Sequence, residues 1–170
     1  MAKSDFYKVN GAQARQDQVV KIGEKNYLLV FDYGKDDEAA ESGYNWRKNY
    51  DHKPTSAELK EDIVKLIDSE TDSRILTGFK WQGNNVYLST ENQMNFKAAY
   101  DLAVQTGGQT LPIKFKLGED ADGNAVYHTF SELAEFTDFY TKAIAFVVAC
   151  LNEGWEEKDS INYENLIADE

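Results

Sequence analysis

Apolar residues recur along this chain with the periods of helices and of short strands. The clearest pattern follows Ser131, where large apolar residues recur at intervals of three and four, the spacing of one helix face. A weaker apolar stripe follows Pro54, and a further helical segment runs from Thr90 to a glycine pair at Gly107 and Gly108. The pattern therefore predicts three main helices. The last of them has the longest stripe, formed by Leu133, Phe136, Tyr140, Ile144, Val147 and Leu151.

The predicted helices have recognisable ends. Thr55 and Glu58 have the spacing of a capping box, in which each side chain binds a free backbone N–H of the other residue. The same spacing at Thr90 and Gln93 predicts the start of the second helix. We expect the third helix to end at residues 152–154, where a glycine follows the apolar stripe.

Between the helices, short apolar runs flank turn residues and predict antiparallel hairpins. The strand at residues 26–31 is apolar on both faces, so something outside its own hairpin has to cover one face. Aromatic residues alternate in residues 44–50, which predicts a short strand or an extended strap. The predicted hairpins pair residues 19–22 with 26–31, 79–81 with 86–88, and 112–117 with 125–130.

Together these elements predict an α+β fold, with three main helices packed on short antiparallel hairpins and an N-terminal polar arm and hairpin. Apolar residues make up 42% of the chain and aromatic residues 13%, which is sufficient for a folded core. The expected organisation is an extended arm (1–17), an N-terminal hairpin and aromatic strap (18–53), an α+β module (54–160) and an acidic C-terminal tail (161–170).

Charge and hydropathy restrict the possible partners. The net charge of −12 disfavours nucleic-acid binding, because an acidic surface repels phosphate backbones. The longest apolar run, Ala143 to Leu151, is shorter than the roughly 18 residues that span a bilayer. The polar N-terminus has no secretory signal, so we expect synthesis in a cytoplasm and no membrane contact. The single cysteine, Cys150, is expected to pack as a small hydrophobic residue.

Two short motifs resemble chemical sites, and each has a simpler structural interpretation. Residues 107–109 match the Gly-Gly-Gln of release factors, but two glycines after a helix are expected to end it. Residues 120–124 resemble the start of a calcium loop, but the required glycine and distal glutamate are missing. The two histidines, His52 and His128, neighbour no nucleophile in a known motif. We therefore predict no catalytic residue, no cofactor, no metal site and no enzyme activity.

Aromatic and basic residues near the N-terminus are the candidates for partner contacts. Flat aromatic rings give a large contact area while losing little conformational entropy. We expect contacts from the polar arm 1–17 and the aromatic strap 44–50, with the hairpin tip 119–124 as a second exposed point. The candidate contact residues are Phe6, Tyr7, Arg15, Tyr44, Trp46 and Tyr50.

Two longer motifs stand out between residues 54 and 160. They are TDSRILTGFKWQG at residues 71–83 and LSTENQMNFKAAY at residues 88–100, and a closing helix then reaches Gly154 and Trp155. With these motifs the segment resembles a family of phage-encoded domains of unknown function. Members of that family occur at the ends of tail-fibre and other virion proteins and in prophages, including those of gut Bacteroidales.

The resemblance implies a non-enzymatic bacteriophage virion structural protein, a tail- or fibre-associated adaptor that docks onto a symmetric assembly. Its implied partners are other phage virion proteins (tail, fibre or capsid components), with the chain itself a homo-oligomer or present in multiple copies. The implied location is the virion, and the host cytoplasm during assembly. Two alternatives stay open: a tail-fibre assembly factor that is not retained in the virion, and a carbohydrate-binding module that uses Tyr and Trp rings.

Overall fold

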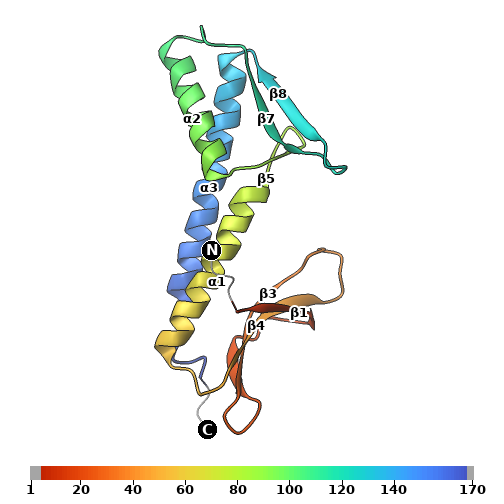
Figure 1. Cartoon of the computed structure of the whole chain (residues 1–170), viewed down its shortest axis with the longest axis vertical. Coiled ribbons are helices and arrows are strands. Elements are labelled where there is room, and N and C mark those ends of the chain that lie inside the picture. Colours follow the sequence, from red (N-terminus) through yellow and green to blue (C-terminus); the bar gives the residue numbers. More distant parts are fainter. Residues whose placement is uncertain (1–4, 168–170) are drawn as a thin grey trace. The chain divides into compact units, whose positions relative to one another are not determined.

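The computed structural model describes residues 5–167 (Figure 1). These residues form three helices and eight short strands, and all strand pairs between named strands are antiparallel. The predicted α+β class is confirmed. The chain divides into two compact units. We call Met1–Ile67 with Lys158–Glu170 the sheet unit, and Asp68–Glu157 the aromatic unit.

The sheet unit contains a four-stranded sheet in the order β1-β4-β3-β2. Its strands are β1 (Tyr7–Ala12), β2 (Gln18–Lys21), β3 (Tyr27–Gly34) and β4 (Gly43–Tyr50). The aromatic unit contains the hairpins β5 (Phe79–Trp81) with β6 (Asn84–Val86) and β7 (Ile113–Glu119) with β8 (Ala125–Phe130), and the helix α2 (Thr90–Gln105). Two helices contribute residues to both units: α1 (Ser56–Thr77) and α3 (Leu133–Ser160).

Helix α1 begins where the capping box predicts. The Thr55 backbone N–H donates to Glu58 Oε2 at 2.9 Å, and the Glu58 backbone N–H donates to Thr55 Oγ1 at 3.3 Å. These bonds satisfy two N–H groups that the first helical turn leaves unpaired. The predicted apolar stripe of α1 consists of Leu59, Ile63, Leu66 and Ile67, and all four are buried. The stripe packs with Leu29 and Phe31 of β3 in the core of the sheet unit.

The N-terminal segment differs from the expected extended arm. Residues 7–12 form β1 and pair with β4, with Tyr7 opposite Arg47 and a bulge near Gly11, whose φ is +100°. An edge strand is held by backbone hydrogen bonds to one neighbour, so it needs little apolar periodicity of its own, and the pattern gave no sign of it. Residues 1–4 of the expected arm lie outside the described residues.

The C-terminal segment packs on the core of the sheet unit. Leu166 is buried, and its backbone oxygen accepts a hydrogen bond of 2.7 Å from the Val19 N–H of β2. Ile161, Tyr163 and Ile167 pack against the same core. The last three residues of the expected acidic tail, 168–170, lie outside the described part of the chain.

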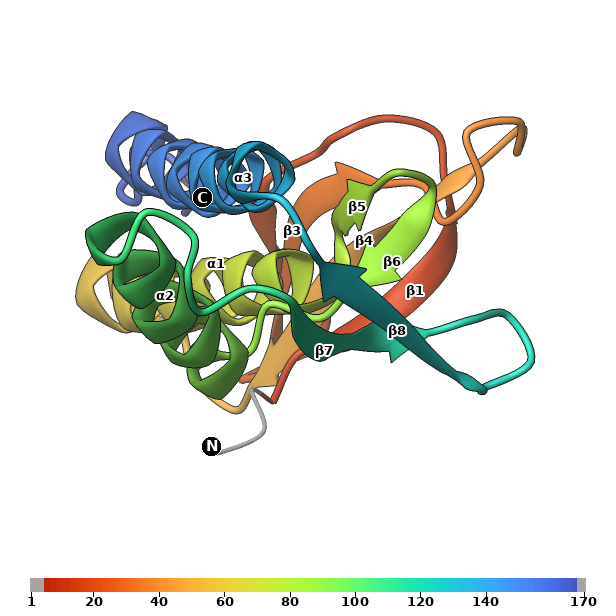
Figure 2. The same cartoon turned by 90° about the horizontal axis from the view of Figure 1, so that it is seen from above.

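The aromatic unit is built around a cluster of buried rings. Phe130, Phe136 and Phe139 are fully buried, and the rings of Phe130 and Phe136 stack with centroids 4.6 Å apart. Helix α2 lies beside α3 in both views (Figures 1 and 2), and Tyr100 of α2 stacks on Tyr140 of α3 at 4.5 Å. Offset and edge-to-face contacts of this kind stabilise a core beyond the area that they bury.

The N-cap of α2 lies one residue before the predicted position, Thr90. The N-cap is Ser89, whose hydroxyl accepts from the Asn92 backbone N–H at 3.2 Å, and Thr90 is the first helical residue. The amide side chains of Asn92 and Gln93 donate back to the Tyr87 and Leu88 carbonyls, so Gln93 does not close a capping box. Because Ser and Thr are both good caps, the sequence pattern alone did not distinguish the two positions.

The end of α2 agrees with the prediction. Gly107 and Gly108 have φ values of +62° and +88°. The Gly108 N–H donates to the Ala103 carbonyl at 2.7 Å, and the Gly107 N–H donates to the Val104 carbonyl at 3.2 Å. This pair of bonds is the Schellman motif, so the tripeptide at 107–109 is explained as a helix terminator.

Helix α3 does not end at residues 152–154 as predicted, but continues to Ser160. Gly154 is buried inside the helix, and a Cβ atom at that position would lie 2.7 Å from Thr71 Oγ1 of α1. The absence of a side chain at Gly154 therefore allows α1 and α3 to approach each other closely within the aromatic unit. None of the helices in residues 5–167 is long and apolar enough to cross a membrane.

Candidate functional site

The two segments expected to contact partners lie side by side. β1, from the predicted arm, pairs with β4, which contains the aromatic strap, so that Lys8 lies opposite Trp46 and Asn10 opposite Tyr44. The two strands are 30 or more residues apart in sequence, and the sheet brings them together at one edge. The sequence did not predict this pairing.

Four of the six candidate contact residues face the interior or pack on their neighbours. Phe6 and Tyr50 are only 9% and 8% exposed and belong to the core of the sheet unit. Trp46 is partly buried against the same core, and Tyr44 meets its ring edge-on with centroids 6.0 Å apart. Burial of these apolar rings stabilises the unit and leaves little of them for a partner.

Tyr7 and Arg15 are the two exposed candidates. The Tyr7 side chain is 41% exposed on β1. The Arg15 guanidinium contacts Asp17 Oδ2 at 2.7 Å and Asp32 Oδ1 at 3.3 Å, and it lies over the Phe31 ring. These contacts hold Arg15 in the loop that precedes β2, whereas Tyr7 belongs to a larger surface.

That surface is the side of the sheet that faces away from α1. Residues directly opposite each other in an antiparallel sheet point to the same side. Arg47 lies opposite both Tyr7 and Val30, and Leu28 lies opposite both Val20 and Asn49. With Val9 opposite Asn45, these residues form what we call the outer sheet face: Tyr7, Val9, Val20, Leu28, Val30, Asn45, Arg47 and Asn49, of which Val30 and Asn45 are buried.

The outer sheet face combines exposed apolar side chains with oriented polar groups. Val20 is 37% exposed, and Leu28 is partly exposed. Asn49 Nδ2 lies 3.3 Å from the Tyr7 hydroxyl, with which it exchanges a hydrogen bond. The sequence contained one signal of this face, because residues 26–31 are apolar on both sides, whereas an exposed strand face is normally polar.

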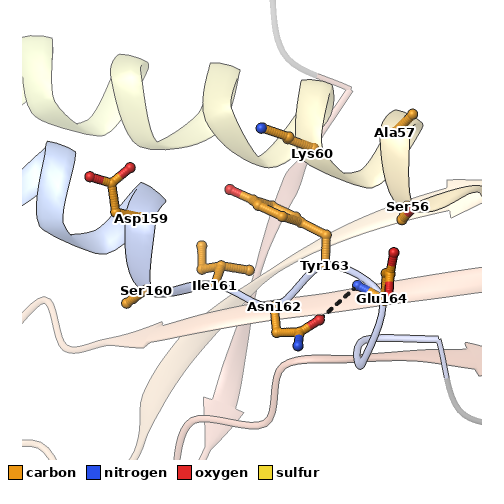
Figure 3. A pocket seen from close by; sticks show the side chains of 9 residues that line it. All are labelled: Ser56, Ala57, Lys60, Asp159, Ser160, Ile161, Asn162, Tyr163 and Glu164. Carbon is orange, nitrogen blue, oxygen red and sulfur yellow. Dashed lines mark hydrogen bonds between the residues drawn. The ribbon is translucent and has the colours of Figure 1, made fainter.

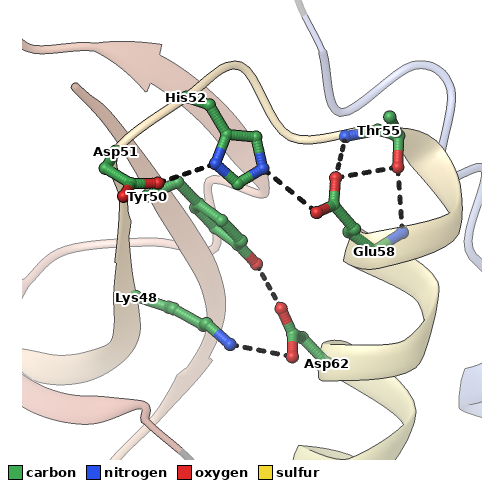
Figure 4. A network of polar contacts seen from close by, with 7 residues as sticks. All are labelled: Lys48, Tyr50, Asp51, His52, Thr55, Glu58 and Asp62. Carbon is green, nitrogen blue, oxygen red and sulfur yellow. Dashed lines mark hydrogen bonds and ion pairs between the residues drawn. The ribbon is translucent and has the colours of Figure 1, made fainter. Parts of the chain in front are cut away.

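The opposite side of β4 is joined to α1 by a polar network (Figure 4). Lys48 Nζ lies 2.8 Å from Asp62 Oδ1, and the Tyr50 hydroxyl donates to Asp62 Oδ2 at 2.7 Å. Lys48 and Asp62 are both largely buried, with side chains 14% and 17% exposed. Burial raises the pKa of Tyr50 well above its usual range, and the hydrogen bond to Asp62 raises it further. Tyr50 therefore stays protonated as a donor.

A second part of this network joins the end of β4 to the first turn of α1. His52 Nδ1 lies 2.8 Å from Asp51 Oδ1, and His52 Nε2 lies 3.0 Å from Glu58 Oε1 (Figure 4). The hydrogen bond to Asp51, followed by that to Glu58, raises the pKa of His52 above its usual value. Hydrogen bonds from the Thr55 backbone and hydroxyl and from His52 lower the pKa of Glu58 to about 2.

We expect His52 to titrate above the usual histidine pKa of about 6.5. Its raised pKa means that the fold binds the protonated ring more strongly, so this contact stabilises the fold at low pH and loses its contribution as pH rises through the folded-state pKa. In an NMR titration, Glu58→Gln should lower the His52 pKa, because glutamine retains the capping bonds but not the charge.

Glu61→Gln is the matched control for this titration, since Glu61 lies on the same helix and pairs with Lys65. It should leave the His52 titration unchanged. If the pKa of His52 were the same in wild type and in Glu58→Gln, the contact between His52 and Glu58 would be contradicted.

A shallow polar cavity of about 480 Å³ lies beside the start of α1 (Figure 3). Lys60 and the Tyr163 ring project into it, and Asn162 Oδ1 accepts from the Glu164 backbone N–H at 3.2 Å. Three of the nine lining residues are charged, namely Lys60, Asp159 and Glu164, and the others are polar, aromatic or apolar residues.

A family model described as a domain of unknown function, DUF4376, matches residues 58–170. The chain belongs to this family. The match covers the whole aromatic unit and most of α1, whereas β1 to β4 and the outer sheet face precede it. No curated protein and no solved structure matches the chain.

The other chemical candidates within the DUF4376 region make contacts within the chain. His128 Nε2 lies 3.0 Å from Glu135 Oε1, and its ring meets Trp81 edge-on at 4.9 Å. At the hairpin tip, Asp120 Oδ1 accepts from the Asp122 and Asn124 backbone N–H groups at 2.9 and 2.8 Å, which closes the turn. Among residues 5–167, no cluster of three or more His, Cys, Asp or Glu side chains is placed to hold a metal ion.

Cys150 is buried in the aromatic unit of the DUF4376 region, as predicted. Burial raises the pKa of its thiol, so the thiolate that reacts with electrophiles is disfavoured at neutral pH.

Proposed function

We propose that this DUF4376 protein is a non-enzymatic bacteriophage virion structural protein, a tail- or fibre-associated adaptor that docks onto a symmetric assembly. It acts in the virion and, during assembly, in the host cytoplasm, and its partners are other phage tail, fibre or capsid components. The resemblance of residues 71–83 and 88–100 to phage-encoded domains supports the phage setting. The observation that carries the docking role is the outer sheet face.

The outer sheet face mixes apolar side chains with hydrogen-bonding groups, as protein interfaces do. Val20, Leu28 and Tyr7 offer apolar area, and burial of one large apolar side chain contributes up to about 1.5–3 kcal/mol. Arg47 and Asn49 lie among them as hydrogen-bonding groups that can orient a partner. Arginine and tyrosine are enriched among the residues that dominate binding energy at protein interfaces.

The position of β1 gives the partner a second means of attachment. β1 is an edge strand, and Tyr7 of the outer sheet face lies on it. An edge strand presents backbone N–H and C=O groups to which an extended segment of another chain can pair. A partner that adds a strand at β1 and covers Tyr7 would use both features of this edge.

The aromatic rings favour docking to protein over the carbohydrate-binding alternative. A sugar platform requires exposed flat rings. Trp81 and Tyr50 are only 3% and 8% exposed, and Trp46 packs partly against the core of the sheet unit, so that Trp155, at 53%, is the one exposed tryptophan among the described residues. An assembly factor would use the same outer sheet face. The two roles differ in location, because an adaptor stays in the particle and an assembly factor does not.

Incorporation into particles tests the proposal. In a host that carries the phage or prophage encoding the chain, we expect wild-type protein at a constant ratio to the major capsid protein in purified particles. Val20→Glu should reduce that ratio about tenfold, because it places a charge on an apolar part of the docking surface. Mass spectrometry of the particles and of the lysate measures both fractions.

Gln16→Glu is the matched control, since it adds the same charge at an exposed residue just before β2. It should be incorporated like wild type, and circular dichroism should show both variants folded. Protein that is abundant in the lysate but missing from particles would overturn the adaptor role in favour of the assembly factor. Equal incorporation of Val20→Glu would exclude the outer sheet face as the docking surface.

A further inference from the structure

Helix α3 carries an exposed apolar stripe within the aromatic unit. Ile144, Val148 and Trp155 are 37%, 48% and 53% exposed, and Leu151 between them is partly exposed. The intervals of four, three and four residues are those of the contact positions of a coiled coil, which lie on one side of a helix. We call these four residues the α3 stripe. Exposed apolar residues scattered singly are ordinary, but four aligned residues over three turns form a contact face.

The α3 stripe continues a line of residues that is already used for helix packing. Tyr140 precedes Ile144 by four residues on the same side of α3, and it stacks on Tyr100 of α2 with centroids 4.5 Å apart. At Tyr140 this side of α3 therefore packs against a helix of its own chain. Further along, at Val148 and Trp155, the same side is exposed. The spacing of the residues on this side of α3 therefore suits packing against another helix.

The charge distribution around the α3 stripe favours α3 of a second copy of this chain as the partner helix. Residues 143–152 contain no charged side chain, in a protein with 28% charged residues and a net charge of −12. The charges nearest to this segment are paired within the chain, because Lys142 contacts Asp138 and Arg74 contacts Glu153. Two copies of an acidic protein repel each other over most of their surfaces, and they can approach most closely where no net charge faces the partner.

We propose that two copies of this chain associate through antiparallel packing of their α3 stripes. Around a two-fold axis between Val148 and Leu151, each Val148 lies opposite Leu151 of the second copy, and each Ile144 lies opposite its Trp155. An isologous contact of this kind uses the same patch on both copies. The proposal involves the aromatic unit and does not rest on the proposed function, which involves the outer sheet face.

The dimer is expected to be weak and reversible in solution. Each copy contributes four large side chains, fewer than the roughly 20–30 residues a side of a standard stable interface. Trp155 is the expected anchor, because tryptophan is enriched among the residues that dominate interface energies. In an assembly that holds several copies close together, a weak contact is strengthened by the high effective concentration.

Sedimentation velocity of the full-length chain from about 1 µM to 1 mM tests this contact over the range of weak protein association. We expect wild type to change from monomer to dimer with concentration. Val148→Glu and Trp155→Glu should each raise the dissociation constant by at least about tenfold, because each buries a charge at the two-fold contact. Both positions are exposed, so the fold should tolerate the changes, and circular dichroism checks this.

Met94→Glu is the matched control, since Met94 is a 66% exposed apolar residue on α2 outside the α3 stripe. It should leave the dissociation constant within about twofold of wild type, the scatter expected for a residue outside the contact. A wild type that stays monomeric across the whole range would overturn the proposal. A dimer that forms equally well with Val148→Glu would overturn it too. If Val20→Glu were the one variant that lost association, the contact would lie on the outer sheet face instead.

Discussion

Phe139→Ala is expected to destabilise the aromatic unit by about 3–5 kcal/mol, the usual range for removal of a buried phenylalanine. Phe139 is fully buried in α3. Its ring lies 5.0 Å from the rings of both Phe96 and Phe130 and 5.2 Å from that of Trp81. Alanine would remove the group on which a helix and two hairpins converge, and rigid neighbouring rings can fill the resulting cavity only partly.

Urea unfolding followed by tryptophan fluorescence measures this loss. Tyr127→Ala is the control, because Tyr127 is an aromatic residue of the same unit with 57% exposure, and it should change the free energy of unfolding by less than about 1 kcal/mol. Phe139→Leu should recover part of the stability, since it restores most of the apolar volume. If Phe139→Ala and Tyr127→Ala unfolded at the same urea concentration, Phe139 would not be central to this core.

Gly43→Ala is expected to destabilise the sheet unit by about 3 kcal/mol, at the upper end of the range for overpacking. A Cβ atom at Gly43 would lie 2.2 Å from the Gly34 backbone oxygen and 2.7 Å from the Tyr33 ring. The register of β3 and β4 shifts between Phe31 and Gly34, where Gly34 comes to pair with Tyr44. Because the obstructing atom belongs to the backbone of the neighbouring strand, a side-chain rotation does not relieve the contact. The two strands would have to separate.

Gly23→Ala provides the control in the same unit. The three atoms nearest to a Cβ there belong to the side chain of Asn26, whose amide nitrogen is 3.2 Å away and can rotate. Its effect should stay within about 1 kcal/mol and can be slightly stabilising, because alanine has fewer unfolded conformations than glycine. Thermal unfolding by circular dichroism compares the two variants, and amide exchange of β3 and β4 locates the damage. Equal melting temperatures for Gly43→Ala and wild type would show that the strands accommodate the methyl group.

Several elements were predictable because their causes lie within a few residues. The stripe from Leu59 to Ile67 faces a core, and the Thr55 to Glu58 capping box starts α1, since both depend on spacing along one helix. Gly107 and Gly108 end α2 because glycine adopts positive φ without strain. Hairpin tips such as residues 120–124 follow from the same local turn chemistry.

The candidate site was predictable only in part. The aromatic strap was identified as a contact segment, yet Tyr50 is buried in the core and bonded to Asp62, because the spacing of aromatic residues does not show which face of a strand meets a helix. Tyr7, which was predicted as a contact residue, is exposed, but its neighbours on the outer sheet face, Val20, Leu28 and Arg47, were not identified. Their grouping depends on the register of four strands.

The sequence by itself determined the α+β class, the existence of the three hairpins and the start of α1, since each follows from side-chain periodicity or turn chemistry over a short stretch of chain. The second strand of the middle hairpin is Asn84–Val86, however, and not residues 86–88 as predicted. Tertiary structure alone decided that residues 7–12 form β1 beside β4, because the ladder partner lies about 40 residues away. It also decided that α3 continues through Gly154, where the missing side chain admits Thr71 of α1. Backbone pairing and close packing between distant segments leave little local pattern, and here they determined which residues form the surface available to a partner.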